Sequence, residues 1–440
     1  MPVPLAILPG DTAAPLFKIF GSDFGRHVLV APHSRIFDLP DESGLDPALL
    51  AALANSAPGE VPLDAVVAPS PQSISLNVSS SCNLSCSYCY AARGSFAGAQ
   101  PDPMSWEVAR AAIDSLLGSA DRSAPVTVGF LGGEPFVNRH LIHRAVHYAT
   151  AEGKRLGLDV RFSVTTNGTL LEEDDVELLR ENPFAVTVSI DGGELVQNRQ
   201  RPTLGGQGSY QLLCAGTRSL LANPGATLVA ARATVTHSDF NLRERLDAVL
   251  TLGFREAGFA PLRSSKGGDA LRDEDWPGYL SAMIEVAQPE LERAYRGEGI
   301  RLTNLAVALK QLYRGASSPY PCGAGGGYFS VAANGDWYAC HRAIGAPAYR
   351  MGNNAGLKSD RRMEFLTARH VHSQSACRQC WARYLCSGGC HQEASSRTDS
   401  SCGFIRGWLE FCLRAYCDLT QRRPEFFTGA VTASKETDHE

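Results

Sequence analysis

The sequence lacks the features that mark several broad classes of protein. Its 41 basic and 46 acidic side chains give a formal net charge of −5 without any polybasic block, so a surface that follows nucleic-acid phosphates is not expected. No apolar window approaches the length of a membrane span, and the N-terminal Met-Pro-Val-Pro-Leu lacks the basic and then apolar pattern of a secretory signal. We therefore expect a cytoplasmic protein without nucleic-acid or membrane partners.

Cysteine, in contrast, is abundant, with 13 residues in 440. Disulfides are unusual in a reducing compartment, whereas metal ligation explains this number without an oxidising environment. The first three thiols, Cys82, Cys86 and Cys89, lie in the run Ser-Cys-Asn-Leu-Ser-Cys-Ser-Tyr-Cys-Tyr. A cubane iron–sulfur cluster takes four thiolates, so a group of three leaves one iron open to an external ligand. Zinc is the alternative, but zinc sites are usually closed by four ligands, and no cysteine or histidine follows until His140.

Strands and amphipathic helices alternate from Ser73 onward. This order predicts an α/β fold with a parallel sheet and right-handed crossovers. The predicted strands cover 74–78, 126–131, 160–166, 185–190 and 227–236, and the predicted helices cover 104–117, 139–156, 172–181, 209–222, 242–252 and 276–296. A small α+β region precedes them, with strands at 26–32 and 35–39, a helix at 47–55 and a Pro-rich linker at 61–71.

Polar residues follow three of these strands. Gly132-Gly133-Glu134-Pro135 comes directly after the strand at 126–131; its glycines permit close backbone approach, and its carboxylate can accept a charge-assisted hydrogen bond from an ammonium group. Thr166-Asn167-Gly168 and Ser189-Ile190-Asp191-Gly192 close the next two strands. Such side chains can bind a ribose or a carboxylate, although Asn-Gly and Asp-Gly also form simple turns.

A second cysteine-rich region extends from about Pro321 to Cys417. Its order and spacing favour metal ligation, and a two-zinc site is the main alternative to iron–sulfur clusters. The predicted ligands are Cys322, Cys340, Cys377, Cys380, Cys386, Cys390 and Cys402.

The Cys-x3-Cys-x2-Cys triad and the Gly-Gly-Glu-Pro motif together resemble the radical S-adenosylmethionine (AdoMet) enzymes. The resemblance implies a partial (β/α)6 TIM-like barrel with cofactors at the carboxyl ends of the strands. It also implies that the open iron of a 4Fe–4S cluster binds AdoMet, which is cleaved to a 5′-deoxyadenosyl radical. Gly132, Gly133, Glu134 and Pro135 would hold the amino group of AdoMet, while Asn167, Ser189, Asp191 and Arg201 would bind its ribose and carboxylate; near Arg201, Gln197 stands where relatives often carry histidine.

The C-terminal cysteines resemble a SPASM domain, which implies two auxiliary 4Fe–4S clusters and three clusters in all. Cys377, Cys380, Cys386 and Cys402 would close one of them. Cys322, Cys340 and Cys390 would hold the other, whose fourth position is either open or filled by Cys412 or Cys417. The predicted domains are an N-terminal region at 1–70 that could bind a leader peptide or merely cap the barrel, the barrel at 71–300, the SPASM domain at 301–420 and a tail at 421–440.

The resemblance implies net oxidation of a ribosomally made peptide or small protein subunit, with flavodoxin or ferredoxin as electron donor. The nearest likeness is to maturases of quinohemoprotein amine dehydrogenase, so a thioether cross-link from cysteine to carbon is the preferred product. Carbon–carbon or aryl cross-linking and formylglycine formation, as in sulfatase maturation, are the enzymatic alternatives. A non-catalytic electron carrier or zinc scaffold is the third, although a carrier has no need of Gly-Gly-Glu-Pro beside an open cluster. The pattern identifies no catalytic acid or base.

Overall fold

A computed structural model describes residues 17–40, 48, 51–53, 62–96, 103–237, 239–263, 268–315 and 318–428. The chain forms two compact units. The barrel unit combines residues 67–271 with 323–366, and the helical unit combines the remaining N-terminal, middle and C-terminal stretches. Because each unit joins segments that are far apart in sequence, the units group the chain differently from the four predicted domains, which stay a prediction.

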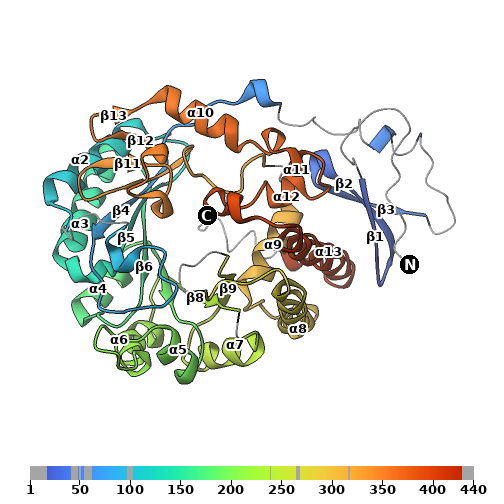
Figure 1. Cartoon of the computed structure of the whole chain (residues 1–440), viewed down its shortest axis with the longest axis horizontal. Coiled ribbons are helices and arrows are strands. Elements are labelled where there is room, and N and C mark those ends of the chain that lie inside the picture. Colours follow the sequence, from blue (N-terminus) through green and yellow to red (C-terminus); the bar gives the residue numbers. More distant parts are fainter. Residues whose placement is uncertain are drawn as a thin grey trace. The chain divides into compact units, whose positions relative to one another are not determined.

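A parallel sheet forms the centre of the barrel unit (Figure 1). Each strand pairs with the next along the chain, as the alternating pattern predicts, and this confirms the α/β class. The sixth strand, at residues 257–261, was not among the predicted ones. The strands are β4 (Ser73–Ser79), β5 (Val126–Gly132), β6 (Val160–Thr166), β7 (Phe184–Ser189), β8 (Leu228–Val235) and β9 (Ala257–Pro261).

On β4 to β7, one face of the sheet carries apolar side chains and the other carries mostly small or polar ones, because successive side chains of a strand point to opposite faces. Phe130, Phe162 and Phe184 are buried on three neighbouring strands. The Phe162 ring lies 6.4 Å from that of Phe130 and 5.2 Å from that of Phe184. Helices cover the outside of the curved sheet in Figure 1, namely α2 (Trp106–Ser119), α3 (Arg139–Leu156), α4 (Glu173–Glu181), α5 (Glu194–Gln200), α6 (Tyr210–Ala222) and α7 (Leu242–Thr251).

The sheet continues beyond β4 with a segment that comes much later in the chain. Strand β10 (Tyr328–Val331) pairs with β4 in parallel, and β11 (Asp336–Tyr338), β12 (Arg350–Asn353) and β13 (Gly356–Leu357) follow in antiparallel order. Cys340, just after β11, therefore belongs to the same unit as the cysteine triad.

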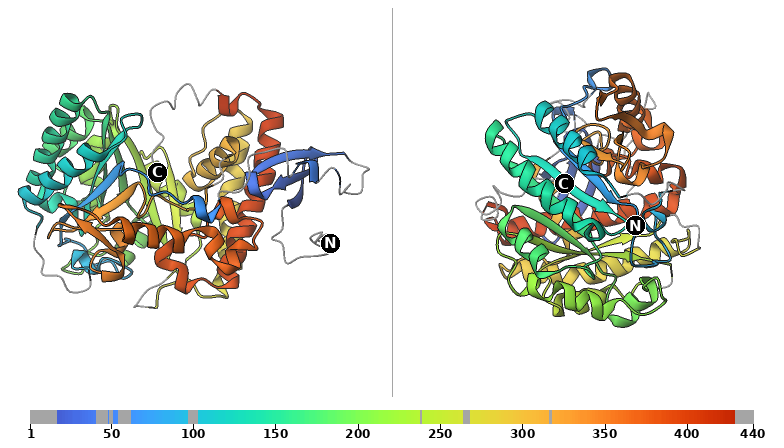
Figure 2. Two further views of the ribbon diagram at one scale, coloured as in Figure 1. Left: turned by 90° about the horizontal axis from the view of Figure 1, so that it is seen from above. Right: turned by 90° about the vertical axis from the view of Figure 1, so that its left-hand side faces the viewer.

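In the helical unit, α13 (Asp399–Arg422) packs against α8 (Asp275–Tyr295) and α9 (Thr303–Arg314). An antiparallel sheet of β1 (Phe17–Ser22), β2 (Gly25–Val30) and β3 (Arg35–Leu39) lies beside α13 (Figure 2), where Lys18 pairs with Glu410 at 2.9 Å. The predicted strand at 35–39 is confirmed, and the one at 26–32 ends earlier in a 3-10 turn. Most of the predicted helix at 47–55 falls outside the described residues. Within the described part of the chain, no helix is long and apolar enough to span a membrane.

Candidate active site

The cysteine triad occupies the loop that leaves the carboxyl end of β4. Each of its sulfurs lies near at least one N–H donor: the Leu84 amide is 3.4 Å from Cys82, the Arg93 amide is 3.3 Å from Cys89, and the Arg201 guanidinium is 3.9 Å from Cys86. Donors directed at sulfur stabilise thiolate, the form that binds metal. Burial has the opposite effect, because it raises the pKa of Cys82 to about 12 and that of Cys86 to about 11. Metal binding to these thiols must therefore release protons.

The two glycines of the Gly-Gly-Glu-Pro segment allow β5 to contact this loop. A Cβ atom on Gly132 would lie 2.2 Å from the Ser79 carbonyl oxygen, and one on Gly133 would lie 2.3 Å from that of Ser81. In this space the Gly133 and Glu134 amides donate hydrogen bonds of 2.9 Å to the same two carbonyls. In the structure the glycines approach the backbone that leads into the cysteine loop, and the predicted close approach to a ligand stays a prediction.

Glu134 is completely buried at the end of β5. Its carboxylate accepts hydrogen bonds from the Thr166 hydroxyl at 2.6 Å, the Asn167 amide at 2.7 Å and the Phe136 amide at 3.2 Å. Burial raises the pKa of Glu134 to about 7, despite the opposing effect of these donors and of Arg201. The carboxylate is thus held in one orientation and titrates near neutral pH.

Asp191, after β7, is completely buried and joins three elements. It accepts hydrogen bonds from Arg201 at 3.0 Å, from the Thr234 amide at 2.8 Å and from the hydroxyl of Tyr88 in the cysteine loop. Burial raises the pKa of Tyr88 well above its usual value, so its hydroxyl remains a donor. Sequence reasoning assigned Asp191 and Arg201 to AdoMet but did not predict that they pair with each other.

Asn167 also contacts the loop: its amide group donates 2.9 Å to Asn83 and lies 3.8 Å from the Cys82 sulfur. Ser189 ends β7 beside Arg232 of β8, and Pro135 is buried at the start of a short 3-10 helix. Gln197, where relatives often carry histidine, is completely buried and accepts from the Asp191 amide at 3.0 Å. The predicted residues therefore meet at the carboxyl ends of β4 to β7, and their roles toward AdoMet stay a prediction.

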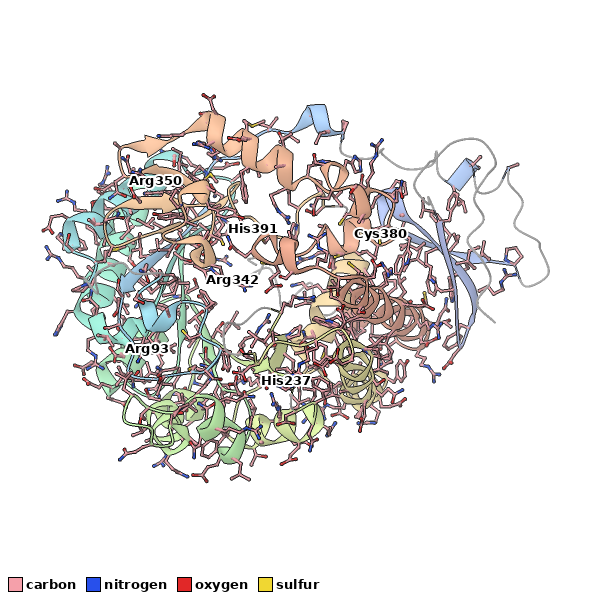
Figure 3. All side chains as sticks on the ribbon, viewed as in Figure 1. Arg93, His237, Arg342, Arg350, Cys380 and His391 are labelled. Carbon is pink, nitrogen blue, oxygen red and sulfur yellow. The ribbon has the colours of Figure 1, made fainter. Side chains whose placement is uncertain are left out.

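Four of the C-terminal thiols form a second group in the helical unit. Cys377 lies on α11 (Ser375–Arg378), Cys386 ends α12 (Arg383–Cys386), Cys380 lies between them (Figure 3) and Cys402 lies on α13. Burial and then the charges of the other three thiols raise the pKa of Cys386 to about 11, against the lowering effect of Arg397. These are the four thiols predicted to close one auxiliary cluster, and their ligation of that cluster stays a prediction.

The other predicted set is divided between the units. Cys340 is buried in the barrel unit, whereas Cys322 and Cys390 belong to the helical unit, so their common ligation stays a prediction. Cys412 is completely buried on α13, and burial raises its pKa. For Cys417, burial and then the carboxylates of Asp38 and Asp418 raise the pKa to about 12. No other cysteine contributes to the pKa shift of Cys412 or of Cys417.

The residues fit iron–sulfur ligation through the chemistry of their donors. Among the described residues, no three Cys, His, Asp or Glu side chains are arranged so that they could hold a single metal ion. The support for clusters is therefore the grouping of the thiols, the N–H donors at their sulfurs and the buried carboxylate after β5. A cubane differs from a single ion because it binds its thiolates through separate irons.

The fold and the site agree with the predicted radical AdoMet enzyme. Residues 76–211, which contain the triad, Glu134, Asp191 and Arg201, match the radical SAM superfamily. The chain thus has a radical SAM domain, and the predicted classes of cofactor, AdoMet and iron–sulfur clusters, are confirmed.

Known proteins resemble most of the chain. The cysteine-type anaerobic sulfatase-maturating enzyme of Clostridium perfringens is 24% identical over 80% of this chain and 94% of its own length. The structure of native anSMEcpe with bound AdoMet and a peptide superposes with a TM-score of 0.66 at 20% identity, covering 80% of this chain and 99% of the other. Streptococcus suis SuiB bound to its precursor peptide SuiA gives a TM-score of 0.51 at 15% identity over 83% and 82% of the two chains. These two structures support the predicted fold.

Proposed function

We propose that this protein is a radical AdoMet maturase that oxidises a side chain within a ribosomally made peptide or small protein. The observation that carries the proposal is the presence of two kinds of thiol group in one chain: a triad beside a buried carboxylate, and a group of four that can close a cluster. The names of the relatives support the substrate class, since they include a sulfatase-maturating enzyme and enzymes bound to peptides.

Bound at the triad, a cluster and AdoMet would supply a 5′-deoxyadenosyl radical that takes one hydrogen atom from the substrate. Glu134 would bind the ammonium group of AdoMet through its buried carboxylate. Arg201, held by Asp191 at 3.0 Å, would face the AdoMet carboxylate. The substrate radical must then lose one electron and one proton to become a closed-shell product. The group of four thiols would hold the acceptor of that electron, while flavodoxin or ferredoxin would supply the electron that cleaves AdoMet.

Two products fit this scheme. The sulfatase-maturating relative favours oxidation of a serine or cysteine side chain to an aldehyde. Serine gives the aldehyde directly by loss of two hydrogens, whereas cysteine gives a thioaldehyde that water must hydrolyse with release of hydrogen sulfide. Thioether formation, the product preferred from the sequence, rests on the three-thiol set of Cys322, Cys340 and Cys390, which would leave one iron open to a substrate thiolate. The comparisons support the first product more strongly than the second.

The experiment combines anaerobically reconstituted protein, AdoMet, a reductant and candidate peptides. We expect 5′-deoxyadenosine together with a peptide changed in mass. A serine-derived aldehyde and a thioether each correspond to the loss of two hydrogens, so an aldehyde-reactive probe and thiol alkylation separate them. Replacing Cys82, Cys86 and Cys89 by alanine should abolish both products. Cys214→Ala, outside every predicted ligand set, is the matched control, and 5′-deoxyadenosine formation by the triple variant would refute the proposal.

A further inference from the structure

An arginine is directed at a sulfur of the four-thiol group. Arg397 donates through Nη1 to the Cys377 sulfur at 2.9 Å and through Nη2 to Oε1 of Gln374 at 3.1 Å. The Gln374 amide in turn donates 2.9 Å to the Arg369 carbonyl. These hydrogen bonds already hold the Arg397 guanidinium in place. Little side-chain conformational entropy is therefore lost when the Cys377 sulfur gains negative charge.

A second arginine makes the same region more positive. Arg369 is anchored by a 2.7 Å hydrogen bond from Nη2 to the Gly389 carbonyl. Burial and then the charge of Arg397 lower the pKa of Arg369, whereas the thiols Cys322, Cys390 and Cys377 raise it. The guanidinium groups of Arg369 and Arg397 repel each other because both are positively charged and partly buried. Additional negative charge near them is therefore stabilised.

We infer that Arg397 is a positioning residue that raises the reduction potential of the cluster held by Cys377, Cys380, Cys386 and Cys402. The inference rests on the part of the proposed function that assigns a cluster to these thiols, and it adds how the chain makes that cluster an electron acceptor.

The physical reason is a difference in charge between two redox states. Reduction adds one electron, and the added negative charge is shared by the ligand sulfurs. A hydrogen bond from a cation stabilises this reduced state more than the oxidised one, and hydrogen bonds to sulfur are among the factors that set cluster potentials. The reduction potential therefore rises. An acceptor with a higher potential takes the electron of a substrate radical more readily.

The test measures reduction potentials in the full-length, reconstituted chain. Alanine at Cys82, Cys86 and Cys89 removes the first cluster from the signal, so a redox titration followed by electron paramagnetic resonance reports only the auxiliary clusters. Arg397→Gln removes the charge but keeps a donor group, and Arg397→Lys keeps the charge. Arg378→Gln is the matched control, because Arg378 is exposed and directly follows Cys377, where solvent screens its charge.

We expect Arg397→Gln to weaken the electron affinity of one auxiliary cluster about tenfold, which for one electron is about 59 mV. Arg397→Lys should recover most of this shift, and Arg378→Gln should cause little. With unchanged iron and sulfide, equal potentials in Arg397→Gln and Arg378→Gln would overturn the inference. Loss of the cluster in both Arg397 variants would overturn it too, because Arg397 would then serve assembly. Absence of a second cluster in the parent chain would instead refute the ligand assignment on which the inference rests.

Discussion

The Nε group of Arg201 donates a hydrogen bond of 3.0 Å to Oδ2 of Asp191, and both side chains are largely buried. The same guanidinium reaches the Cys86 sulfur at 3.9 Å. One ion pair thus connects the end of β7 to the cysteine loop after β4. The arrangement keeps a cation next to a sulfur that must lose its proton to bind metal.

Breaking this pair should destabilise the protein. Asp191→Asn leaves the Arg201 charge without its buried partner, and such a loss typically costs 3–5 kcal/mol; we expect about 3 kcal/mol in a denaturant titration. The exposed pair of Arg243 and Asp247 provides the control, since Asp247→Asn should cost no more than about 0.5 kcal/mol. The Asp191→Asn, Arg201→Gln double variant should recover part of the loss. Similar costs for Asp191→Asn and Asp247→Asn would contradict the importance of the buried pair.

AdoMet binding should strengthen as the pH rises through about 7, because the pKa of Glu134 is raised from 4.5 to about 7 by burial. Below that pKa the carboxyl is neutral and cannot pair with an ammonium group, so affinity at pH 6 should be about tenfold lower than at pH 8. The free energy of unfolding changes in the opposite direction. Because the folded state disfavours the ionised form of Glu134, the stability of the protein falls as the pH rises from 4.5 to about 7. Equilibrium dialysis of reconstituted protein measures the affinity.

Glu134→Gln should bind AdoMet weakly at every pH and lose this dependence. If that variant keeps the pH profile of the parent chain, another group is responsible for the profile.

Gly133→Ala should disrupt the first cluster alone. Its Cβ would lie 2.3 Å from the Ser81 carbonyl oxygen and 2.7 Å from that of Arg93, so the cysteine loop must move. We expect about one third of the iron to be lost if three cubanes are present, with 5′-deoxyadenosine formation reduced more than tenfold. Gly118→Ala is the control: nothing lies within 4 Å of its added Cβ, and alanine in α2 should add up to about 1 kcal/mol of stability. Full iron content in Gly133→Ala would show that the loop tolerates displacement.

Two cysteines of α13 should respond differently to replacement by alanine. Cys402→Ala removes a predicted ligand and should lower the iron content by about one third. Cys412→Ala should keep the iron and cost about 1 kcal/mol of stability, because its thiol is completely buried in the packed face of the helix. Iron and stability measurements on both variants distinguish the roles. Iron loss in Cys412→Ala would identify that residue as a ligand.

Strong local patterns made much of the barrel predictable. Alternating apolar residues identified strands β4 to β8 to within a few residues. The thiol spacing and the family resemblance predicted the metal ligands, and these stay a prediction. β9 was missed because Ala257–Pro261 is short, ends in proline and carries only one large apolar side chain, Phe259. Strand β1 was missed for a related reason: its residues, Phe-Lys-Ile-Phe-Gly-Ser, alternate only partly, and it is held by pairing with β2 and packing on α13.

The sequence by itself determined the chemistry available to this protein, because the identities and spacings of the thiols and of the Gly-Gly-Glu-Pro segment depend on no distant contact. Only the tertiary structure decided which polar groups meet. It paired Asp191 with Arg201 and Tyr88, directed the two glycines at the cysteine loop, and brought Arg397 to within 2.9 Å of the Cys377 sulfur, 20 residues away in the chain. Hydrogen bonds act over about 3 Å, and no local pattern in the sequence encodes which segments the fold will bring that close.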